Sequence, residues 1–256
     1  MNSLENKVAI VTGASSGIGQ ATALLFAQEG AKVVVSARRQ NELNALVTRI
    51  EKAGGQAIAV AGDVKDESMA MSLVETALAR FGGLDIAFNN AGTTGETGPV
   101  SGMTLSGWHD TLDTNLTGAF LGAKHQVPAM IKRGGGSLIF TSSFVGHTVG
   151  LPGMAAYAAS KAGLVGLVQV LAAELGVKGI RANAILPGGT DTPMNAANLP
   201  GAAPGTQAFI DALHALKRMA SPEEIAQSVL YLASGMSSFV TGAALLVDGG
   251  VSINRT

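Results

Sequence analysis

Short apolar runs alternate with helix-length segments along almost the whole chain, and this alternation constrains the fold more than any other feature of the sequence. Most of the runs are nearly continuously apolar, as in strands that are covered on both faces. A repeating strand–helix order predicts βαβ units with right-handed crossovers. We therefore expect a doubly wound α/β fold, with a parallel sheet that is covered by helices on both faces and with ligands at the carboxyl ends of the strands. The expected strands lie at 8–11, 32–36, 57–61, 84–88, 137–141, 180–186 and 244–247.

Several helix ends can be placed from local sequence. Ser221, Pro222 and Glu224 combine an N-cap residue, a first-turn proline and a capping-box acid, so a helix is expected to begin there. Glycines are expected to end other helices because glycine readily takes the left-handed conformation of a helix end. The positions are Gly30, 54–55 and 134–136.

Composition limits the classes of protein that fit. The chain has 256 residues, 47% of them hydrophobic and 14% charged, so we expect one domain over 1–256 with a single large core. The formal net charge of −1 offers no basic field for nucleic acid. There is no cysteine, no signal peptide is apparent, and the most apolar stretch, 162–175, is interrupted by polar residues. We expect a cytoplasmic protein that contacts no membrane, and the spacing of histidines and carboxylates suggests no metal site.

The first strand-to-helix turn is rich in glycine. Gly13, Gly17 and Gly19 follow the first strand in VAIVTGASSGIGQA, where glycine allows a sharp turn and lets backbone N–H groups face an anionic pyrophosphate. The spacing differs from the common dinucleotide fingerprint, and an ordinary tight turn is the alternative in a chain with 34 glycines. The β-branched strand before the turn and the apolar helix after it favour cofactor binding. The other expected cofactor-binding residues of this turn are Ser15, Ser16 and Ile18.

The end of the second strand favours NADP(H) over NAD(H). NAD-selective folds of this type usually carry an acid there to hold the ribose 2′-hydroxyl, whereas a 2′-phosphate is better matched by a guanidinium. Here Ala37 occupies the place of the acid, and Arg38 and Arg39 follow. The alternative is a solvated surface pair, and it weighs more for Arg39 than for Arg38.

The ends of the third and fourth strands offer further contacts to a cofactor. Asp63, with Val64 after it, can accept a hydrogen bond from an adenine amino group, although an N-cap or turn acid is the alternative. In FNNAG, small residues and amides let the chain pass close to a flat ligand while still offering hydrogen bonds. A purely structural loop is the alternative for Asn90, Ala91 and Gly92.

A tyrosine and a lysine one helical turn apart carry the catalytic signal. In YAASK, Tyr157 and Lys161 lie on one face of an expected helix over 155–175, so the ammonium can lie near the phenol oxygen. A nearby cation favours the phenolate, and Lys161 together with the positive charge of the nicotinamide, in a partly dry cleft, would bring the tyrosine pKa from about 10 toward neutral pH. An accidental pair on a surface helix is the alternative, but this tyrosine follows a strand end that reads LIFTSSFVG.

The motifs TGASSGIG, NNAG, DTNLTGAF, YAASK, ILPGGTDTPM and LLVDGG occur in the order typical of the short-chain dehydrogenase/reductase superfamily, which the chain resembles over essentially its whole length. The resemblance, to an NADP-preferring and 3-oxoacyl-reductase-like branch, implies a Rossmann-type doubly wound sheet of about seven parallel strands. It also implies a catalytic set of Asn115, Ser143, Tyr157 and Lys161. It implies that Tyr157 is the acid/base, that Lys161 lowers its pKa and binds the nicotinamide ribose, and that Asn115 helps to hold a proton-relay water. Ser142 is the alternative to Ser143.

The resemblance also assigns the segment that passes the nicotinamide carboxamide. It implies Pro187, Gly188 and Thr192 there, with Thr190 as a second candidate threonine because Gly189 and Thr190 depart from the family pattern. A basic residue that the family often has before Gly17 is missing, since Ser16 stands there. The expected preference for NADP(H) therefore depends on Arg38.

The expected reaction is hydride transfer between NADP(H) and a carbonyl or secondary alcohol, with a ketone, a sugar or a 3-oxoacyl thioester as substrate. Residues 194–220 are expected to form a lid over the substrate. The segment 162–175 is apolar around most of its circumference, which predicts a homo-oligomer; the resemblance suggests a tetramer with 110–131 also in the contact. The alternatives are a non-catalytic NADP(H)-binding regulator, an NAD-preferring dehydrogenase, and an epimerase or dehydratase of the same fold.

Overall fold

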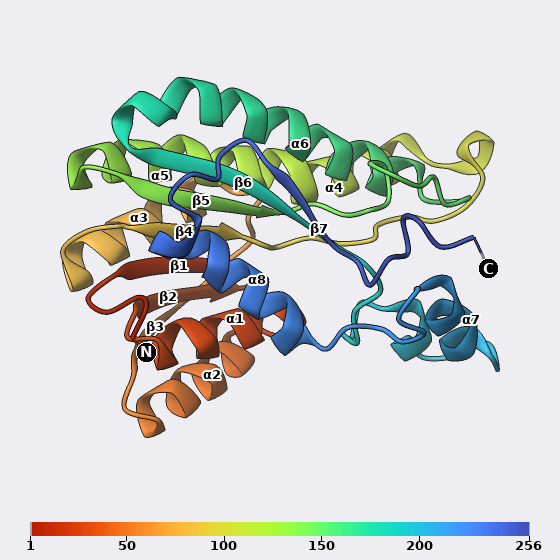
Figure 1. Ribbon diagram of the computed structural model, residues 1–256, viewed down its shortest axis with the longest axis horizontal. Helices are drawn as coiled ribbons and strands as arrows, with labels where there is room; N and C mark the ends of the chain where they lie inside the picture. The colour runs from red at the N-terminus through yellow and green to blue at the C-terminus, as the bar shows by residue number, and fades with distance from the viewer. Residues whose placement is uncertain (1, 256) are drawn as a thin grey trace.

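The computed structural model describes residues 2–255 and contains one sheet of seven parallel strands. The strand order is β3-β2-β1-β4-β5-β6-β7 (Figure 1). This is the doubly wound α/β architecture expected from the sequence, and the apolar runs explain it because nearly all central strand residues are buried. The strands are β1 (Val8–Thr12), β2 (Lys32–Ala37), β3 (Gln56–Ala61), β4 (Ile86–Asn89), β5 (Gly136–Thr141), β6 (Ile180–Pro187) and β7 (Ala244–Val247).

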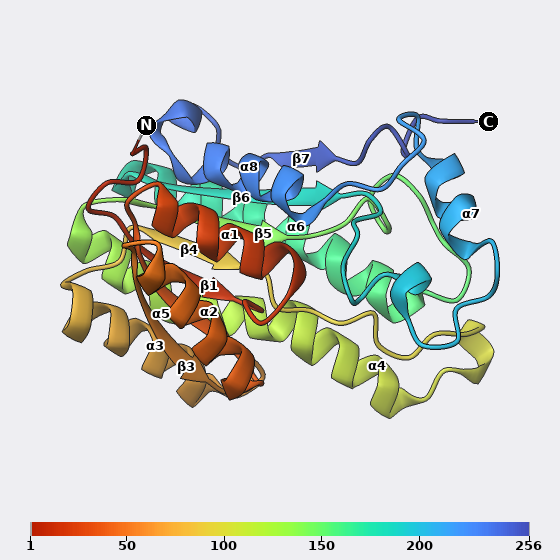
Figure 2. The same cartoon turned by 90° about the horizontal axis from the view of Figure 1, so that it is seen from below.

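Helices cover both faces of the sheet, and each face has its own apolar core (Figure 2). The core against α1, α2 and α8 takes Ala9 and Val11 of β1, whereas Val8 and Ile10 face the core against α3, α5 and α6. This alternation follows from the two-residue period of a strand. The helices are α1 (Gly17–Gln28), α2 (Gln40–Lys52), α3 (Glu67–Phe81), α4 (Leu105–Leu112), α5 (Gly118–Arg133), α6 (Ala155–Leu175), α7 (Thr206–Leu213) and α8 (Pro222–Ala233).

The long helix expected at 110–131 is interrupted in the structure. A π-helical turn, Asp113–Thr117, joins α4 to α5 and makes one helical run from 105 to 133. A π-turn inserts one residue into the helical ladder and is common at functional sites. Asn115 lies inside it, so the interruption falls on an expected catalytic residue.

Local end signals are mostly confirmed. The capping box of α8 is complete, since Ser221 Oγ accepts from Glu224 N at 3.3 Å and Glu224 Oε2 accepts from Ser221 N at 2.9 Å. Gly134 ends α5 with φ of 93°. The expectation that glycines to position 136 close this helix is wrong at its last residue, because Gly136 begins β5.

Helix α6 has the bounds expected for it, 155–175, and so begins before the apolar stretch 162–175. Together with the turn that follows, Ala155–Lys178 is long and apolar enough to cross a membrane, and 33% of its most apolar window is buried within the chain. This is weak evidence for a membrane span, because α6 packs along β6 and its Leu164 and Val168 belong to the core. The expectation that no stretch is long and apolar enough to span a bilayer is nevertheless wrong, because Ala155–Lys178 meets both conditions.

Arg181 of β6 connects the end of α8 to the sheet through hydrogen bonds. Its guanidinium donates to Leu232 O at 2.8 Å, Ser234 O at 3.2 Å and Val240 O at 3.3 Å. We expect Arg181→Met to lower the free energy of unfolding by about 2 to 3 kcal/mol, because half-buried carbonyls lose a charged donor. Urea denaturation measures this. Arg80 is exposed at the end of α3, and Arg80→Met should change the free energy of unfolding by less than about 1 kcal/mol. Equal effects of the two variants would contradict the stabilising role of Arg181.

Candidate active site

The carboxyl ends of β1 and β4 lie side by side at the point where the strand order reverses. Successive strands extend from β1 toward β3 on one side and from β4 toward β7 on the other, so their connections leave on opposite faces. This switch point is where doubly wound sheets bind ligands. The glycine-rich turn follows β1 and the NNAG segment follows β4, so both expected cofactor segments meet here.

The glycine-rich turn lacks room for side chains. Gly13 and Gly17 have φ of 66° and 55°, which favours glycine. A Cβ on Gly13 would lie 2.9 Å from Ala91 Cα, and one on Gly19 would lie 2.7 Å from Asn90 Nδ2. The turn packs against the NNAG segment and leads into the N-terminus of α1, where backbone N–H groups favour an anion. The glycine-rich turn therefore leaves space that side chains would fill, and this space beside the N-terminus of α1 fits the phosphates of a dinucleotide.

Arg39 is attached to this turn. Its Nη2 donates to Ser15 Oγ at 2.9 Å and Ser16 Oγ at 3.3 Å, and its Nε lies 3.5 Å from Glu42 Oε1. Sequence reasoning gave a solvated surface role to Arg39 as readily as a binding role, but the structure links it to the glycine-rich turn. Arg38 is exposed. Two guanidinium groups therefore lie at the end of β2, where Ala37 takes the place of an acid.

The side chains at the ends of β3 and β4 have structural bonds. Asp63 Oδ1 accepts from Lys65 N at 3.1 Å, which is the turn role considered as its alternative. The Asn90 amide donates to Thr12 O at 3.1 Å and accepts from Thr141 Oγ1 at 3.0 Å. Asn90 thus joins the ends of β1 and β5 across β4. Its neighbour Gly92 lies against the expected catalytic residues.

Lys161 points from α6 to the end of β5. Its ammonium donates to Thr141 O at 2.6 Å, and Nζ lies 5.7 Å from the centre of the Tyr157 ring. The side chain is 4% exposed, and burial lowers the pKa of Lys161 to about 8. One helical turn of separation therefore places a buried cation beneath the phenol ring.

The phenol of Tyr157 hydrogen-bonds with Ser143. Burial raises the pKa of Tyr157, and the bond with Ser143 opposes this increase. The sequence interpretation expected Lys161 to bring the pKa of Tyr157 down. In the chain alone the opposite direction holds, because desolvation of the phenolate outweighs the other contributions.

The two candidate serines have different surroundings. Ser142 Oγ is 1% exposed and donates to Lys161 O at 2.7 Å, which attaches the end of β5 to the backbone of α6. Ser143 Oγ accepts from Val145 N at 3.1 Å and lies beside the phenol of Tyr157. Only the hydroxyl of Ser143 is next to the phenol, so the geometry favours it as the residue that touches substrate.

The Asn115 side chain is buried and fully engaged. Its Oδ1 accepts from Thr93 N at 2.8 Å, and its Nδ2 donates to Thr93 O and Ser160 Oγ, both at 2.9 Å. A Cβ on Gly92 would lie 3.1 Å from Asn115 Oδ1 and 3.2 Å from Lys161 Nζ. The π-turn therefore brings Asn115 to the segment after β4 and to α6 at once.

The segment after β6 separates the two candidate threonines. Thr190 is 7% exposed, and its Oγ1 donates to Gly188 O at 3.1 Å. The methyl group of Thr192 lies 2.9 Å from where a Cβ on Gly17 would stand. Of the two candidate threonines, Thr192 therefore has the side chain that reaches the glycine-rich turn.

Comparisons with known proteins agree over nearly the full length. Residues 13–252 match the family model described as enoyl-(acyl carrier protein) reductase. The chain is 39% identical over 248 residues to a cyclohexanol dehydrogenase of an Acinetobacter species, covering 97% of this chain and 96% of that protein. It is 41% identical over 250 residues to the 3-oxoacyl-(acyl-carrier-protein) reductase FabG of Thermotoga maritima, covering 98% and 99%. The crystal structure of a short-chain type dehydrogenase/reductase from Mycobacterium marinum has a TM-score of 0.91 at 35% identity, covering 98% and 97%.

The chain belongs to the short-chain dehydrogenase/reductase superfamily. It is therefore an oxidoreductase, and the resemblance drawn from its motifs is confirmed. The expected Ser, Tyr and Lys set and the glycine-rich turn lie at the same edge of the sheet in this short-chain dehydrogenase/reductase.

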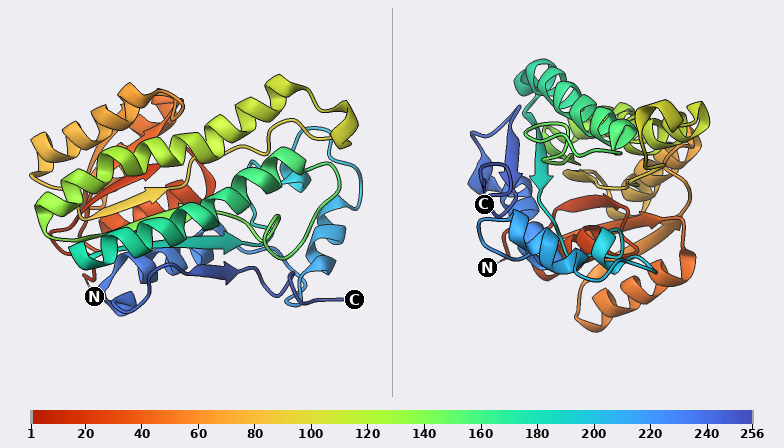
Figure 3. Two further views of the ribbon diagram at one scale, coloured as in Figure 1. Left: turned by 90° about the horizontal axis from the view of Figure 1, so that it is seen from above. Right: turned by 90° about the vertical axis from the view of Figure 1, so that its right-hand side faces the viewer.

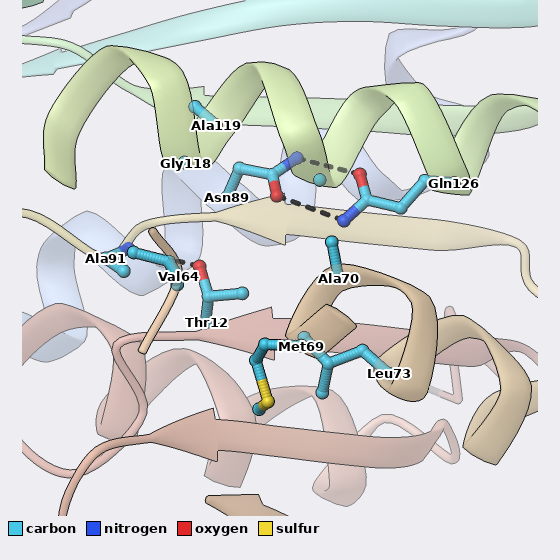
Figure 4. A pocket seen from close by; sticks show the side chains of 11 residues that line it. Thr12, Val64, Met69, Ala70, Leu73, Asn89, Ala91, Gly118, Ala119 and Gln126 are labelled. Carbon is cyan, nitrogen blue, oxygen red and sulfur yellow. Dashed lines mark hydrogen bonds between the residues drawn. The ribbon is translucent and has the colours of Figure 1, made fainter. Parts of the chain in front are cut away.

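A buried amide pair supports the NNAG segment of this short-chain dehydrogenase/reductase. Asn89 Nδ2 donates to Gln126 Oε1 at 2.9 Å, and Gln126 Nε2 donates to Asn89 Oδ1 at 3.0 Å (Figure 4). A cavity of about 20 Å³ lies beside this pair and Thr12, between α3 and α5, and is large enough for about one water molecule. A Cβ on Gly122 would lie 2.6 Å from Asn89 Oδ1, so that glycine makes room for the pair.

Sequence reasoning missed several residues that hold the site together. They share a role, which is to bond an expected site residue or, for Gln126, its neighbour Asn89. Ser160 was within reach of sequence reasoning because it belongs to YAASK. Thr12 and Thr141 also lie in quoted motifs, TGASSGIG and LIFTSSFVG, but their bonds reach segments far apart in the chain, and Thr93 and Gln126 have no local signal.

Proposed function

We propose that this chain transfers a hydride between NADP(H) and a carbonyl or secondary alcohol, with Tyr157 as acid/base. The observation that carries the proposal is the position of the Tyr157 phenol, which bonds with Ser143 and has the Lys161 ammonium 5.7 Å from its ring centre. The glycine-rich turn at the neighbouring strand end would hold the cofactor phosphates through Gly13, Gly17 and Gly19.

The proposed chemistry divides between cofactor and protein. A nicotinamide bound at this site would supply the hydride in reduction and accept it in oxidation. Ser143 and Tyr157 would donate hydrogen bonds to the carbonyl oxygen, which gains negative charge as its carbon becomes tetrahedral. Tyr157 would then transfer its phenolic proton to that oxygen to give the alcohol, and the Lys161 ammonium would stabilise the phenolate. Asn115 would hold the segment around Gly92 in place.

Two guanidinium groups and the missing acid support a preference for NADP(H). Arg38 is exposed at the end of β2, and Arg39 is anchored on Ser15 and Ser16. Both would face a 2′-phosphate, which accepts strong charge-assisted hydrogen bonds from arginine.

We expect Arg38→Asp to lower the ratio of kcat/KM for NADPH to that for NADH by about 10- to 100-fold, because it replaces attraction to the 2′-phosphate with repulsion. Arg39→Ala should lower the ratio by about tenfold. Steady-state kinetics with both cofactors measure these ratios. Arg49→Asp makes the same charge change at an exposed position near the end of α2 and should leave the ratio unchanged. An unchanged ratio in Arg38→Asp would contradict the proposed role of Arg38.

The substrate class that we propose is a ketone, a sugar or a 3-oxoacyl thioester. Relatives named for cyclohexanol and for a 3-oxoacyl chain on a carrier protein support a carbonyl or secondary alcohol of this kind. We propose 194–220 as the substrate lid. It includes α7, which lies beyond the carboxyl ends of the strands (Figure 1), and the ring of Phe209 on it is 66% exposed.

The decisive experiment follows the absorbance of NADPH and NADH with a panel of cyclic ketones, sugars and 3-oxoacyl thioesters. Oxidation of NADPH with at least one class supports the proposal. Binding of NADPH without turnover on any carbonyl would favour a regulator. Conversion of substrate without net NADPH consumption would favour an epimerase or dehydratase.

We also propose a homo-oligomer, a tetramer by family resemblance. Helices α5 and α6 lie side by side on one outer face (Figure 3), and the side chains of Phe120 and Val170 on them are 48% and 53% exposed. Much of the expected apolar circumference of α6 is nevertheless covered by the sheet, as at Leu164 and Val168. Light scattering coupled to gel filtration measures the mass, and a monomer would contradict the proposal.

A further inference from the structure

His214 is the most buried polar side chain of the lid segment 194–220, at 2% exposed. It follows α7, and its ring lies between two backbone groups. Nδ1 is 2.8 Å from Ile210 O, and Nε2 is 2.9 Å from Gly189 N. A carbonyl can only accept and an N–H can only donate, so both bonds form only when the imidazole is neutral and its proton is on Nδ1. The two backbone partners thus determine both the charge and the tautomer.

Gly189 is shaped to receive this ring. A Cβ at position 189 would lie 2.7 Å from His214 Cε1, so a side chain there would exclude the imidazole. Gly189 O accepts from Ala220 N at 2.9 Å, and Thr190 pairs with Ala220 in a short parallel bridge. The lid therefore holds both the N–H and the C=O of Gly189. This explains the glycine that departs from the family pattern after Pro187.

The segment held by His214 continues to the glycine-rich turn. Three residues after Gly189, the methyl group of Thr192 packs toward Gly17 at 2.9 Å from the position of a Cβ there. A displacement of Gly189 would therefore move the backbone that borders the proposed cofactor site.

We propose that neutral His214 is a positioning residue, which fixes Gly189 and thereby couples the lid to the backbone that borders the cofactor site. The expected effect on KM rests on the proposed function, whereas the hydrogen bond between His214 and Gly189 does not depend on it. Protonation of Nε2 would set two N–H groups against each other and break the contact with Gly189. A cavity of about 300 Å³ beside the ring gives a protonated imidazole room to turn away.

The charged groups around His214 come from every element packed against it, and most are already bonded. Glu224 of α8 pairs with Arg218 at 2.7 Å. Asp248, which follows β7, accepts from Gly250 N at 2.9 Å and Ser252 N at 3.1 Å. On the lid itself, Asp211 accepts from Met219 N at 3.0 Å, and Lys217 Nζ donates to Ala212 O at 3.1 Å. None of these bonds uses either ring nitrogen of His214.

Two substitutions separate positioning from packing. His214→Gln retains an acceptor oxygen for Gly189 N–H and does not titrate, whereas His214→Phe fills the space without an acceptor. We expect His214→Phe to raise the KM for NADPH about tenfold and to speed amide hydrogen exchange at Gly189 by about tenfold, which corresponds to about 1.4 kcal/mol. His214→Gln should stay within about threefold of the unmodified protein at pH 7.5 in both measurements.

The pH profile gives a readout that packing alone would not move. In the unmodified protein, the KM for NADPH should rise as the pH falls from about 7.5 to about 5.5, because a proton on Nε2 breaks the bond with Gly189 N–H. The cofactor phosphate also gains a proton in this range, so the readout is the rise in KM compared with that of the unmodified protein. His214→Gln should show a clearly smaller rise. His109→Gln, at an exposed position on α4, is the matched control and should show the full rise. If His214→Phe does not fold, this comparison of the Gln variant with the unmodified protein still decides.

Two results would overturn the inference: a Phe variant with unchanged KM and unchanged exchange at Gly189, or a Gln variant whose KM rises with falling pH as much as that of the unmodified protein. Failure of the proposed function looks different. In that case the unmodified protein would neither bind nor oxidise NADPH, while exchange at Gly189 in the Phe variant would still test the contact.

Discussion

Tyr157→Phe is expected to reduce turnover of NADPH with any active carbonyl by about 100- to 10,000-fold, the range that a positioned proton donor supplies. Phenylalanine keeps the ring over the Lys161 ammonium and removes only the oxygen that bonds with Ser143. The carbonyl oxygen then lacks both one hydrogen bond and its proton source. Stopped-flow or steady-state absorbance of NADPH measures the loss.

The same variant should bind the cofactor almost normally. The glycine-rich turn and the arginines at the end of β2 do not contact the Tyr157 hydroxyl, so the dissociation constant of NADPH should stay within about threefold by fluorescence titration. Tyr231→Phe removes the other phenolic hydroxyl of the chain, on α8, and should leave turnover unchanged. Loss of binding and turnover together in Tyr157→Phe would place the residue in the scaffold and would count against an acid/base role.

Most of the fold was predictable because it depends on local periodicity. Each expected strand was found, with shifts of a residue or two at its ends, since an apolar run that is buried on both faces has few alternatives. The capping box of α8 was predictable for the same reason, as all its atoms lie within four residues. The π-turn at Asp113–Thr117 was not, because the helical pattern continues through it and only contacts with Thr93 and Ser160 show what it positions.

The site was predictable where a motif carries it, and not where it depends on which segments meet. The spacing of Tyr157 and Lys161 on one helix face needs only helical geometry. The choice between Ser142 and Ser143 needed the position of α6, because one hydroxyl is taken by the Lys161 carbonyl. Similarly, the contact of Arg39 with Ser15 joins residues that are 24 positions apart.

The pKa of Tyr157 in the chain alone shifts in the opposite direction from the one predicted for the site with a nicotinamide bound. Sequence reasoning considered the attraction between a cation and a phenolate and had no measure of burial. In the structure, desolvation raises the pKa of Tyr157 and lowers that of Lys161 to about 8. The protein therefore holds two groups that both resist carrying charge, which is a source of instability at the site itself.

Lys161→Met is consequently expected to make the protein more stable while it removes activity. Methionine fills much of the lysine volume without a charge to desolvate, and Lys161 is only 4% exposed. Turnover should fall by about 100-fold or more, because the phenolate of Tyr157 loses its cation. The free energy of unfolding should rise by about 2 kcal/mol at pH 7. Removing the buried charge contributes about 3 kcal/mol, from a pKa of about 8 in the folded chain against an ordinary value of 10.5, and loss of the bond from Nζ to Thr141 O offsets about 1 kcal/mol.

The pH dependence of this difference gives its cause. Below about pH 8, Lys161 is protonated in both the folded and the unfolded chain, so folding bears the whole cost of burying the charge. Between that pH and 10.5 the unfolded chain binds more protons than the folded one, so the stability of the unmodified protein rises with pH. The advantage of Lys161→Met should therefore shrink by about 1 kcal/mol between pH 7 and pH 9 in urea titrations. An advantage that is independent of pH would indicate better packing rather than removal of a buried charge.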